Sequence, residues 1–110
     1  MDISMYEKEG FKVIAPLGRI DSMTSIDLGD WVEQNVNPPT CNVILDCSEV
    51  EYVSSAGLRV ILNVMKLMKK HEYVFSICKP QEHVRELLDI SGFASLIPVY
   101  RSLEDCISKK

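Results

Sequence analysis

The sequence has no excess of positive charge and no long apolar run. Its 110 residues include 16 acidic and 12 basic side chains, so the formal net charge is −4 and the pI is about 5.1. Nucleic-acid-binding domains usually present a basic patch, so we expect no nucleic-acid partner. No segment approaches the ~20 apolar residues that span a membrane, so we expect no direct membrane insertion. Residues 1–4 lack the start of a signal peptide, which predicts a cytoplasmic protein.

Motifs for metal binding, nucleotide binding and catalysis are also missing. The four cysteines, Cys41, Cys47, Cys78 and Cys106, form no Cys-x-x-Cys pair, and no histidine lies at metal-ligand spacing from them. We therefore expect reduced thiols, no metal and no cofactor. The chain has no Gly-x-x-x-x-Gly-Lys or Gly-x-Gly-x-x-Gly loop for a nucleotide. Ser55 is not in a Gly-x-Ser-x-Gly elbow, so we expect no catalytic residues and no enzymatic activity.

Strand-like and helix-like segments alternate along the chain. With 46% apolar and 25% charged residues, the composition is that of one globular domain, expected over residues 1–110. The expected strands are 3–7, 11–15, 41–45, 73–78 and 96–100. The expected helices are 23–36, 55 or 56 to 70, 79 or 80 to about 91, and 103–107. A turn at 8–10 should join the first two strands as an antiparallel hairpin.

This alternation predicts an α/β fold with a mostly parallel sheet, right-handed crossovers and an antiparallel strand at its start. The residues expected on strands are Val13, Ile14, Val43, Leu45, Val74, Phe75 and Ile77. The residues expected to be buried on helices are Ile61, Val64, Met65, Leu87 and Leu88.

Proline and glycine mark several of the expected boundaries. Pro16 ends the second strand and Gly18 supplies a turn after it. Pro80 suits the first turn of the third helix, where its missing N–H has no cost. Gly92 should end that helix in the left-handed conformation. Pro98 confines the last strand to an edge of the sheet.

The most informative stretch is residues 45–59, Leu-Asp-Cys-Ser-Glu-Val-Glu-Tyr-Val-Ser-Ser-Ala-Gly-Leu-Arg. It lies between an apolar, β-branched run and a segment with helical periodicity. Ser54 or Ser55 is a natural N-cap, because a serine hydroxyl can accept a bond from an unpaired amide of the first turn. Small residues at positions 56 and 57 let the backbone come close to a partner. A cap alone would already explain the serine pair.

This stretch resembles the signature of the STAS domain, and in particular of the bacterial anti-sigma factor antagonists. In that family a strand ends in Asp-Leu-Ser or similar, and Asp-Ser-Ser/Ala-Gly-Leu-Gly/Arg then opens a helix. The serine that the family phosphorylates lies two residues before the glycine, which corresponds to Ser55, and Ser54 stands where the family usually has an acidic residue. Gly18, Ile20 and Asp21 match an earlier family pattern, Leu-x-Gly-x-Ile/Leu-Asp before a helix.

The resemblance implies a STAS-like mixed sheet with about four helices, and a partner-switching function. Unmodified, the protein would bind an anti-sigma factor with serine-kinase activity and free the sigma factor; phosphorylated on Ser55, it would let go. Strand-to-helix loops gather where α/β proteins place their sites, which predicts the partner surface. Its expected residues are Asp21, Ser22, Ser54, Ser55, Gly57, Leu58 and Arg59. The oligomeric state stays open between a monomer and a weak dimer.

Two other functions stay open. A STAS module without a kinase could serve as a fixed interaction subunit of a signalling or lipid-transport assembly, and Ser54 in place of the acidic residue favours this alternative. A sensor of a small ligand or nucleotide is the third. Along the second helix, Arg59, Asn63, Lys66 and Lys70 form a polar stripe that is either a solvated face or a docking surface for an acidic partner.

Overall fold

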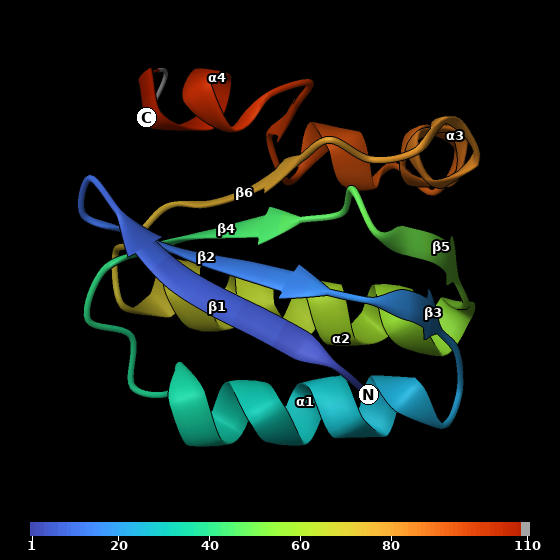
Figure 1. Cartoon of the computed structure of the whole chain (residues 1–110), viewed down its shortest axis with the longest axis horizontal. Coiled ribbons are helices and arrows are strands. Elements are labelled where there is room, and N and C mark those ends of the chain that lie inside the picture. The colour runs from blue at the N-terminus through green and yellow to red at the C-terminus, as the bar shows by residue number, and fades with distance from the viewer. Residues whose placement is uncertain (109–110) are drawn as a thin grey trace.

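A five-stranded sheet in the order β1-β2-β4-β6-β7 forms the centre of the molecule (Figure 1). In the computed structural model, which describes residues 1–108, its strands are β1 (Ile3–Lys8), β2 (Phe11–Pro16), β4 (Asn42–Asp46), β6 (Phe75–Cys78) and β7 (Val99–Tyr100). Strand β1 is antiparallel to β2, and the other neighbouring pairs are parallel. The predicted mixed sheet with an antiparallel first strand is therefore confirmed.

Four α-helices pack around this sheet within residues 1–108: α1 (Thr24–Asn35), α2 (Ser55–Lys70), α3 (Glu82–Ile90) and α4 (Leu103–Ser108). Helices α1 and α2 lie side by side against one face, and α4 covers the other (Figure 1). Strand β2 contributes side chains to the cores on both faces of the sheet, because successive side chains of a strand point to opposite faces. Its Ile14 belongs to the larger core under α1 and α2, whereas Phe11 and Val13 belong to the smaller core under α4.

The periodicity of α2 explains its place in the fold. Its buried apolar residues Ile61, Val64 and Met68 recur at three- and four-residue steps, so they form one face toward the sheet. The predicted polar stripe on the same helix, residues 59, 63, 66 and 70, is exposed along its whole length. The larger core also takes in Val84 and Leu88 of α3.

Two short strands were not predicted. Strand β3 (Gly18–Ile20) and strand β5 (Val50–Val53) pair in parallel and form a separate two-stranded sheet. The turn predicted at Gly18 is wrong in part, because this residue has a positive φ of 96° but also begins β3. Three- and four-residue strands are too short to show an alternating pattern. These two form because they pair with each other, although Ile20 and its partner Val53 are 33 positions apart in sequence.

The start of the third helix was also predicted too early. Helix α3 begins at Glu82, so Pro80 precedes the helix instead of lying in its first turn. Lys79 has a φ of 53°, which is incompatible with a right-handed helix. The end was predicted correctly, since Gly92 follows the helix in the left-handed conformation with a φ of 82°.

The last two strands are shorter than predicted. Val74 precedes β6 and is 40% exposed; its backbone N–H donates to the side chain of Asn42 over 2.8 Å instead of joining the strand ladder. Strand β7 has two residues, because the backbone N–H groups of Leu96 and Ile97 bond back to the carbonyl of Phe93 in a 3-10 turn, η1 (Phe93–Ser95), and do not join the sheet. Met65 and Leu87, predicted to be buried, are half-buried and pack against the border of the larger core.

Candidate functional site

The predicted partner surface lies where β3 and β5 end and α1 and α2 begin. The two short strands pair Ile20 with Val53. The chain then passes through Asp21 and Ser22 toward α1, and through Ser54 into α2. The backbone N–H of Ser54 donates to the carbonyl of Ile20 over 2.8 Å. This bond holds the two strand-to-helix connections together, so Ile20 and Ser54, which are 34 positions apart in sequence, become neighbours at one end of the molecule.

Ser54 is the N-cap of α2. Its backbone is extended, and its hydroxyl oxygen accepts a hydrogen bond from the N–H of Gly57 over 3.1 Å. Its carbonyl accepts the first helical bond, from the N–H of Leu58, over 2.9 Å. The sequence left the cap open between two serines, and the structure assigns it to Ser54. The neighbouring Ser55 is exposed as the first residue of the helix, and within residues 1–108 no hydrogen bond of its side chain is found.

Removing this cap should destabilise the protein. We expect Ser54→Ala to lower the free energy of unfolding by about 1 kcal/mol, because the N–H of Gly57 loses its acceptor. Ser55→Ala is the matched control, and we expect it to change the free energy by no more than ~0.5 kcal/mol. Urea unfolding of both variants measures the difference. Equal losses for the two variants would contradict the assignment of the cap.

Gly57 lies at the closest approach of α2 to the short sheet. A Cβ atom at this position would lie 2.8 Å from Cγ2 and from the carbonyl oxygen of Ile20, and 2.9 Å from Cγ1 of Val53. Only a hydrogen atom fits there. Gly57 is buried, so this residue supports the predicted surface from below.

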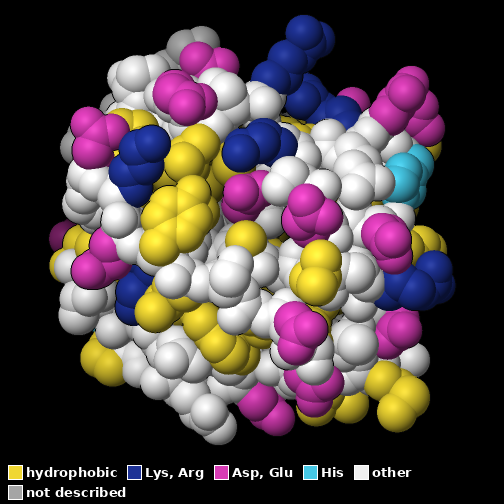
Figure 2. All heavy atoms as spheres, viewed as in Figure 1, with side chains coloured by type: hydrophobic (Ala, Val, Ile, Leu, Met, Phe, Trp, Pro, Cys, Tyr) yellow, Lys and Arg dark blue, Asp and Glu magenta, His cyan; other side chains and the backbone are white. Residues whose placement is uncertain are grey.

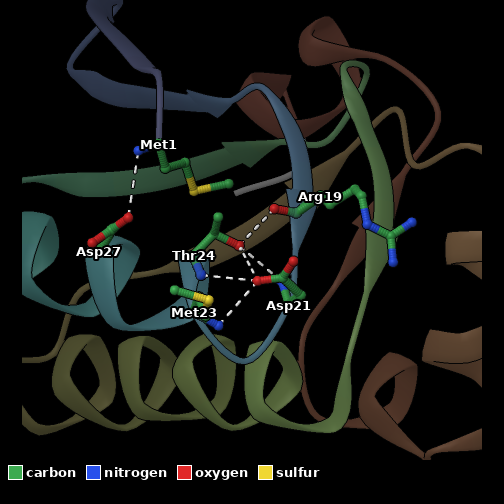
Figure 3. Close-up of polar contacts among 6 residues, drawn as sticks. All are labelled: Met1, Arg19, Asp21, Met23, Thr24 and Asp27. Atoms are coloured by element: carbon green, nitrogen blue, oxygen red, sulfur yellow. Dashed lines mark hydrogen bonds and ion pairs between the residues drawn. The ribbon is translucent and has the colours of Figure 1, made fainter.

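Asp21 organises the turn that leads into α1 (Figure 3). Its Oδ1 accepts hydrogen bonds from the backbone N–H groups of Met23 and Thr24, each over 3.0 Å. The hydroxyl of Thr24 donates to the carbonyl of Arg19 over 2.7 Å and accepts the N–H of Asp21 over 2.8 Å. The N–H groups of Thr24 and Met23 lower the pKa of the Asp21 carboxyl below its ordinary value. Asp21 is therefore a carboxylate at neutral pH, and its position is well defined.

The seven predicted residues differ in exposure. Ser22, Ser55 and Arg59 are exposed, Asp21, Ser54 and Leu58 are half-buried, and Gly57 is buried. The predicted residues thus include both groups that can face a partner and groups that hold those in place.

Apolar side chains beside these residues were missed by the sequence analysis. Met23 and Ile26, at the start of α1, are 77% and 63% exposed. On β5, Tyr52 is 39% exposed, and the guanidinium of Arg19 lies 4.3 Å from the centroid of its ring. Exposed apolar side chains mark an interaction surface where they form a contiguous patch, and single ones are common on any protein surface. The three-residue spacing of Met23 and Ile26, which places them on one side of a helix, could be recognised in the sequence. Their exposure could not, because it depends on where α1 packs.

The four cysteines are the other reactive side chains that the sequence analysis considered. The four cysteines are free thiols, and burial raises the pKa of the Cys47 thiol to about 12, so this group is protonated at neutral pH. Among residues 1–108, no cluster of histidine, cysteine or acidic side chains is arranged to hold a metal ion. In the same range, no helix is both long enough and apolar enough to cross a bilayer.

Comparisons with known proteins agree with this fold. A family model described as the STAS domain matches residues 2–106. BtrV of Bordetella bronchiseptica, which is assigned as an anti-sigma factor antagonist, is 34% identical over 104 residues, which cover 94% of this chain and 90% of BtrV.

Solved structures show the same fold at lower sequence identity. A Thermotoga maritima protein assigned as an anti-sigma factor antagonist has a TM-score of 0.89 at 17% identity, covering 97% of this chain and 92% of its own. The anti-sigma factor antagonist SpoIIAA in its unphosphorylated form has a TM-score of 0.80 at 14% identity, covering 98% and 95%. SpoIIAA of Bacillus has also been solved in a phosphorylated form, with a TM-score of 0.73 at 14% identity, covering 98% of both chains.

Proposed function

The chain belongs to the STAS domain family, and from this premise we propose that it is an anti-sigma factor antagonist controlled by phosphorylation of Ser55. In the unmodified state it binds an anti-sigma factor with serine-kinase activity, and it has no enzymatic activity of its own. The observation that carries the proposal is that two neighbouring serines have different roles at the start of α2. Ser54 holds the helix cap, which leaves the hydroxyl of Ser55 exposed at the first position of α2.

The partner would contact both helix N-termini at once. Met23 and Ile26 supply exposed apolar area, and Ser55 and Arg59 supply polar groups on the adjacent helix. Apolar anchors surrounded by polar groups are the usual composition of a protein interface. The bond between Ser54 and the carbonyl of Ile20 keeps the two halves of this surface in a fixed relation.

Phosphorylation would end binding without refolding the protein. A phosphoserine carries ~1.5–2 negative charges at neutral pH, which adds repulsion and desolvation cost within an interface. The free protein can accept the same group, because the N-terminus of a helix stabilises anions. Arg59 lies four residues after Ser55 and therefore on the same side of α2, where its guanidinium is within reach of a phosphate.

A phosphate-transfer assay tests the proposal. The protein is incubated with its cognate anti-sigma kinase and radiolabelled ATP. We expect the wild type to take up label and Ser55→Ala to take up none, because at the start of α2 the hydroxyl of Ser54 is used in the cap and that of Ser55 is exposed. Ser54→Ala is the matched control and should still be labelled. Label on Ser55→Ala would place the modification elsewhere.

A second candidate function is a fixed interaction subunit of a signalling or lipid-transport assembly. The observation that favours it is Ser54, where the family usually has an acidic residue. Serine and aspartate cap helices about equally well, so Ser54 preserves the cap while it removes a negative charge beside Ser55. A kinase that reads this charge would not recognise the chain. A wild type that no partner kinase labels, but that still binds a partner, would support this function.

A further inference from the structure

Strand β1 is an unprotected edge of the central sheet. It pairs with β2 on one side, and within residues 1–108 no strand lies beyond it (Figure 1). Natural edge strands are usually protected by a proline, a bulge, an inward-pointing charge or a lysine, and the one lysine of β1, Lys8, is its last residue. Strand β1 contains no proline, and its register with β2 is continuous over all six residues from Ile3 to Lys8. A free edge of this kind can accept another strand.

The backbone groups that face outward belong to the odd-numbered residues. A two-residue turn, Glu9 and Gly10, closes the β1–β2 hairpin. Lys8 and Phe11, which flank this turn, therefore form a hydrogen-bonded pair. Because such pairs alternate along an antiparallel ladder, the even positions bond to β2. The N–H of Leu17 indeed donates to the carbonyl of Asp2 over 2.9 Å. The backbone groups of residues 3, 5 and 7 therefore point away from the sheet.

The side chains of β1 are exposed on both faces of the sheet. Five of its six residues are exposed and only Ile3 is half-buried; Met5 is 43% and Tyr6 45% exposed. Figure 2 shows hydrophobic side chains lying among charged ones over the path of this strand. The charged side chains at its two ends, Asp2 and Lys8, are exposed and have no ion-pair partner within residues 1–108.

We propose that β1 pairs antiparallel with β1 of a second copy of this chain, centred on Met5, so that the two five-stranded sheets become one. Residues 3, 5 and 7 of one copy then face residues 7, 5 and 3 of the other, which forms about six backbone hydrogen bonds. On one face of the joined sheet the two Met5 side chains meet. On the other face, Ser4 lies opposite Tyr6, and Asp2 lies opposite Lys8.

Charge complementarity favours the register centred on Met5, and it favours a second copy of this chain as the partner of β1. Centring the pair on Met5 places both copies of Asp2 opposite Lys8, which gives two ion pairs. Centring it on Tyr6 places Lys8 opposite Ser4 and loses both ion pairs. Centring it on Glu7 places two carboxylates directly opposite each other, which is destabilising. None of the seven residues of the proposed partner surface lies on β1, so the dimer is independent of the Ser55 switch.

A charge exchange tests the interface. Sedimentation equilibrium from about 10 μM to 1 mM measures the dimer dissociation constant for Asp2→Lys, for Lys8→Glu and for the double variant. We expect each single change to raise this constant by at least about tenfold, because it places like charges opposite each other. The double change restores opposite charges and should return the constant to within about threefold of the wild type. Lys66→Glu on α2 is the control for net charge and should leave dimerisation unchanged.

The double variant cannot restore dimerisation through an ion pair within one chain. Asp2 and Lys8 are six residues apart on one strand, or about 20 Å at ~3.3 Å per residue, which is too far for an ion pair. Thermal unfolding of each variant at low concentration confirms that the monomer is still folded. A protein that is monomeric up to 1 mM would overturn the proposal. So would a dimer that neither single change weakens, or one that the double change does not restore.

Amide hydrogen exchange provides a second readout. On going from dilute to concentrated protein, the amides of Ile3, Met5 and Glu7 should become protected, whereas those of Ser4 and Tyr6 should change little because they already bond to β2. Protection of both sets, or of neither, would overturn the pairing. Protection of the odd amides that appears only when another protein is added would assign the edge to that protein instead of a second copy.

Discussion

Replacing Ser55 by aspartate should weaken binding to the anti-sigma partner about tenfold or more. The substitution adds one negative charge to an exposed position at the start of α2. Like-charge juxtaposition and loss of solvation in an interface cost several kcal/mol, and tenfold in affinity corresponds to about 1.4 kcal/mol. The fold should be unharmed, because an acidic residue in the first turn of a helix stabilises it by ~0.3–1 kcal/mol.

Two neutral substitutions separate charge from size. Ser55→Asn has nearly the shape of the aspartate without its charge, and Ser55→Ala removes the hydroxyl; we expect both to bind the partner with affinity close to that of the wild type. Isothermal titration calorimetry of the three variants against the cognate anti-sigma factor gives the dissociation constants. If Ser55→Asn is as weak as Ser55→Asp, steric fit controls binding. If Ser55→Asp binds like the wild type, the switch does not act through charge at this position.

Substituting Gly57 should have the largest effect on stability. We expect Gly57→Ala to lower the free energy of unfolding by ~1–3 kcal/mol, because its Cβ would overlap the backbone carbonyl and side chain of Ile20 and the side chain of Val53. The carbonyl of Ile20 cannot move away freely, since it also accepts the N–H of Ser54. The clash would push α2 away from β3 and disturb the surface around Ser55.

Gly29 provides the matched control for this substitution. It lies inside α1, where an added Cβ would be 4.0 Å from Cγ2 of Val60, an ordinary van der Waals contact. We expect Gly29→Ala to stabilise the protein by ~0.5–1 kcal/mol, because alanine favours a helix interior over glycine. Urea unfolding of both variants should therefore give shifts of opposite sign. A Gly57→Ala variant as stable as the wild type would contradict the close approach of α2 to the short sheet.

The sequence by itself determined the order and type of the main elements. Their signals are local: β-branched runs, helical periodicity and a turn such as Glu9-Gly10 act on residues close together in the chain. The stretch around Ser55 also indicated where the second helix begins, because a serine pair followed by small residues is a local property of a helix start. Such features predict an α/β domain, whereas the position of its candidate site was predicted from the resemblance of residues 45–59 to the STAS signature and from where α/β folds place their sites.

The tertiary structure decided what depends on distant contacts. The short strands β3 and β5 form only because they pair with each other, and the carbonyl of Ile20 brings Ser54 and the start of α1 together. Packing also decided that Gly57 is buried while Met23 and Ile26 stay exposed. A pattern along the chain reports which side chains share a face, but not whether another element covers that face. For this reason the sequence proposed a candidate site, and only the fold determined which of its residues are exposed.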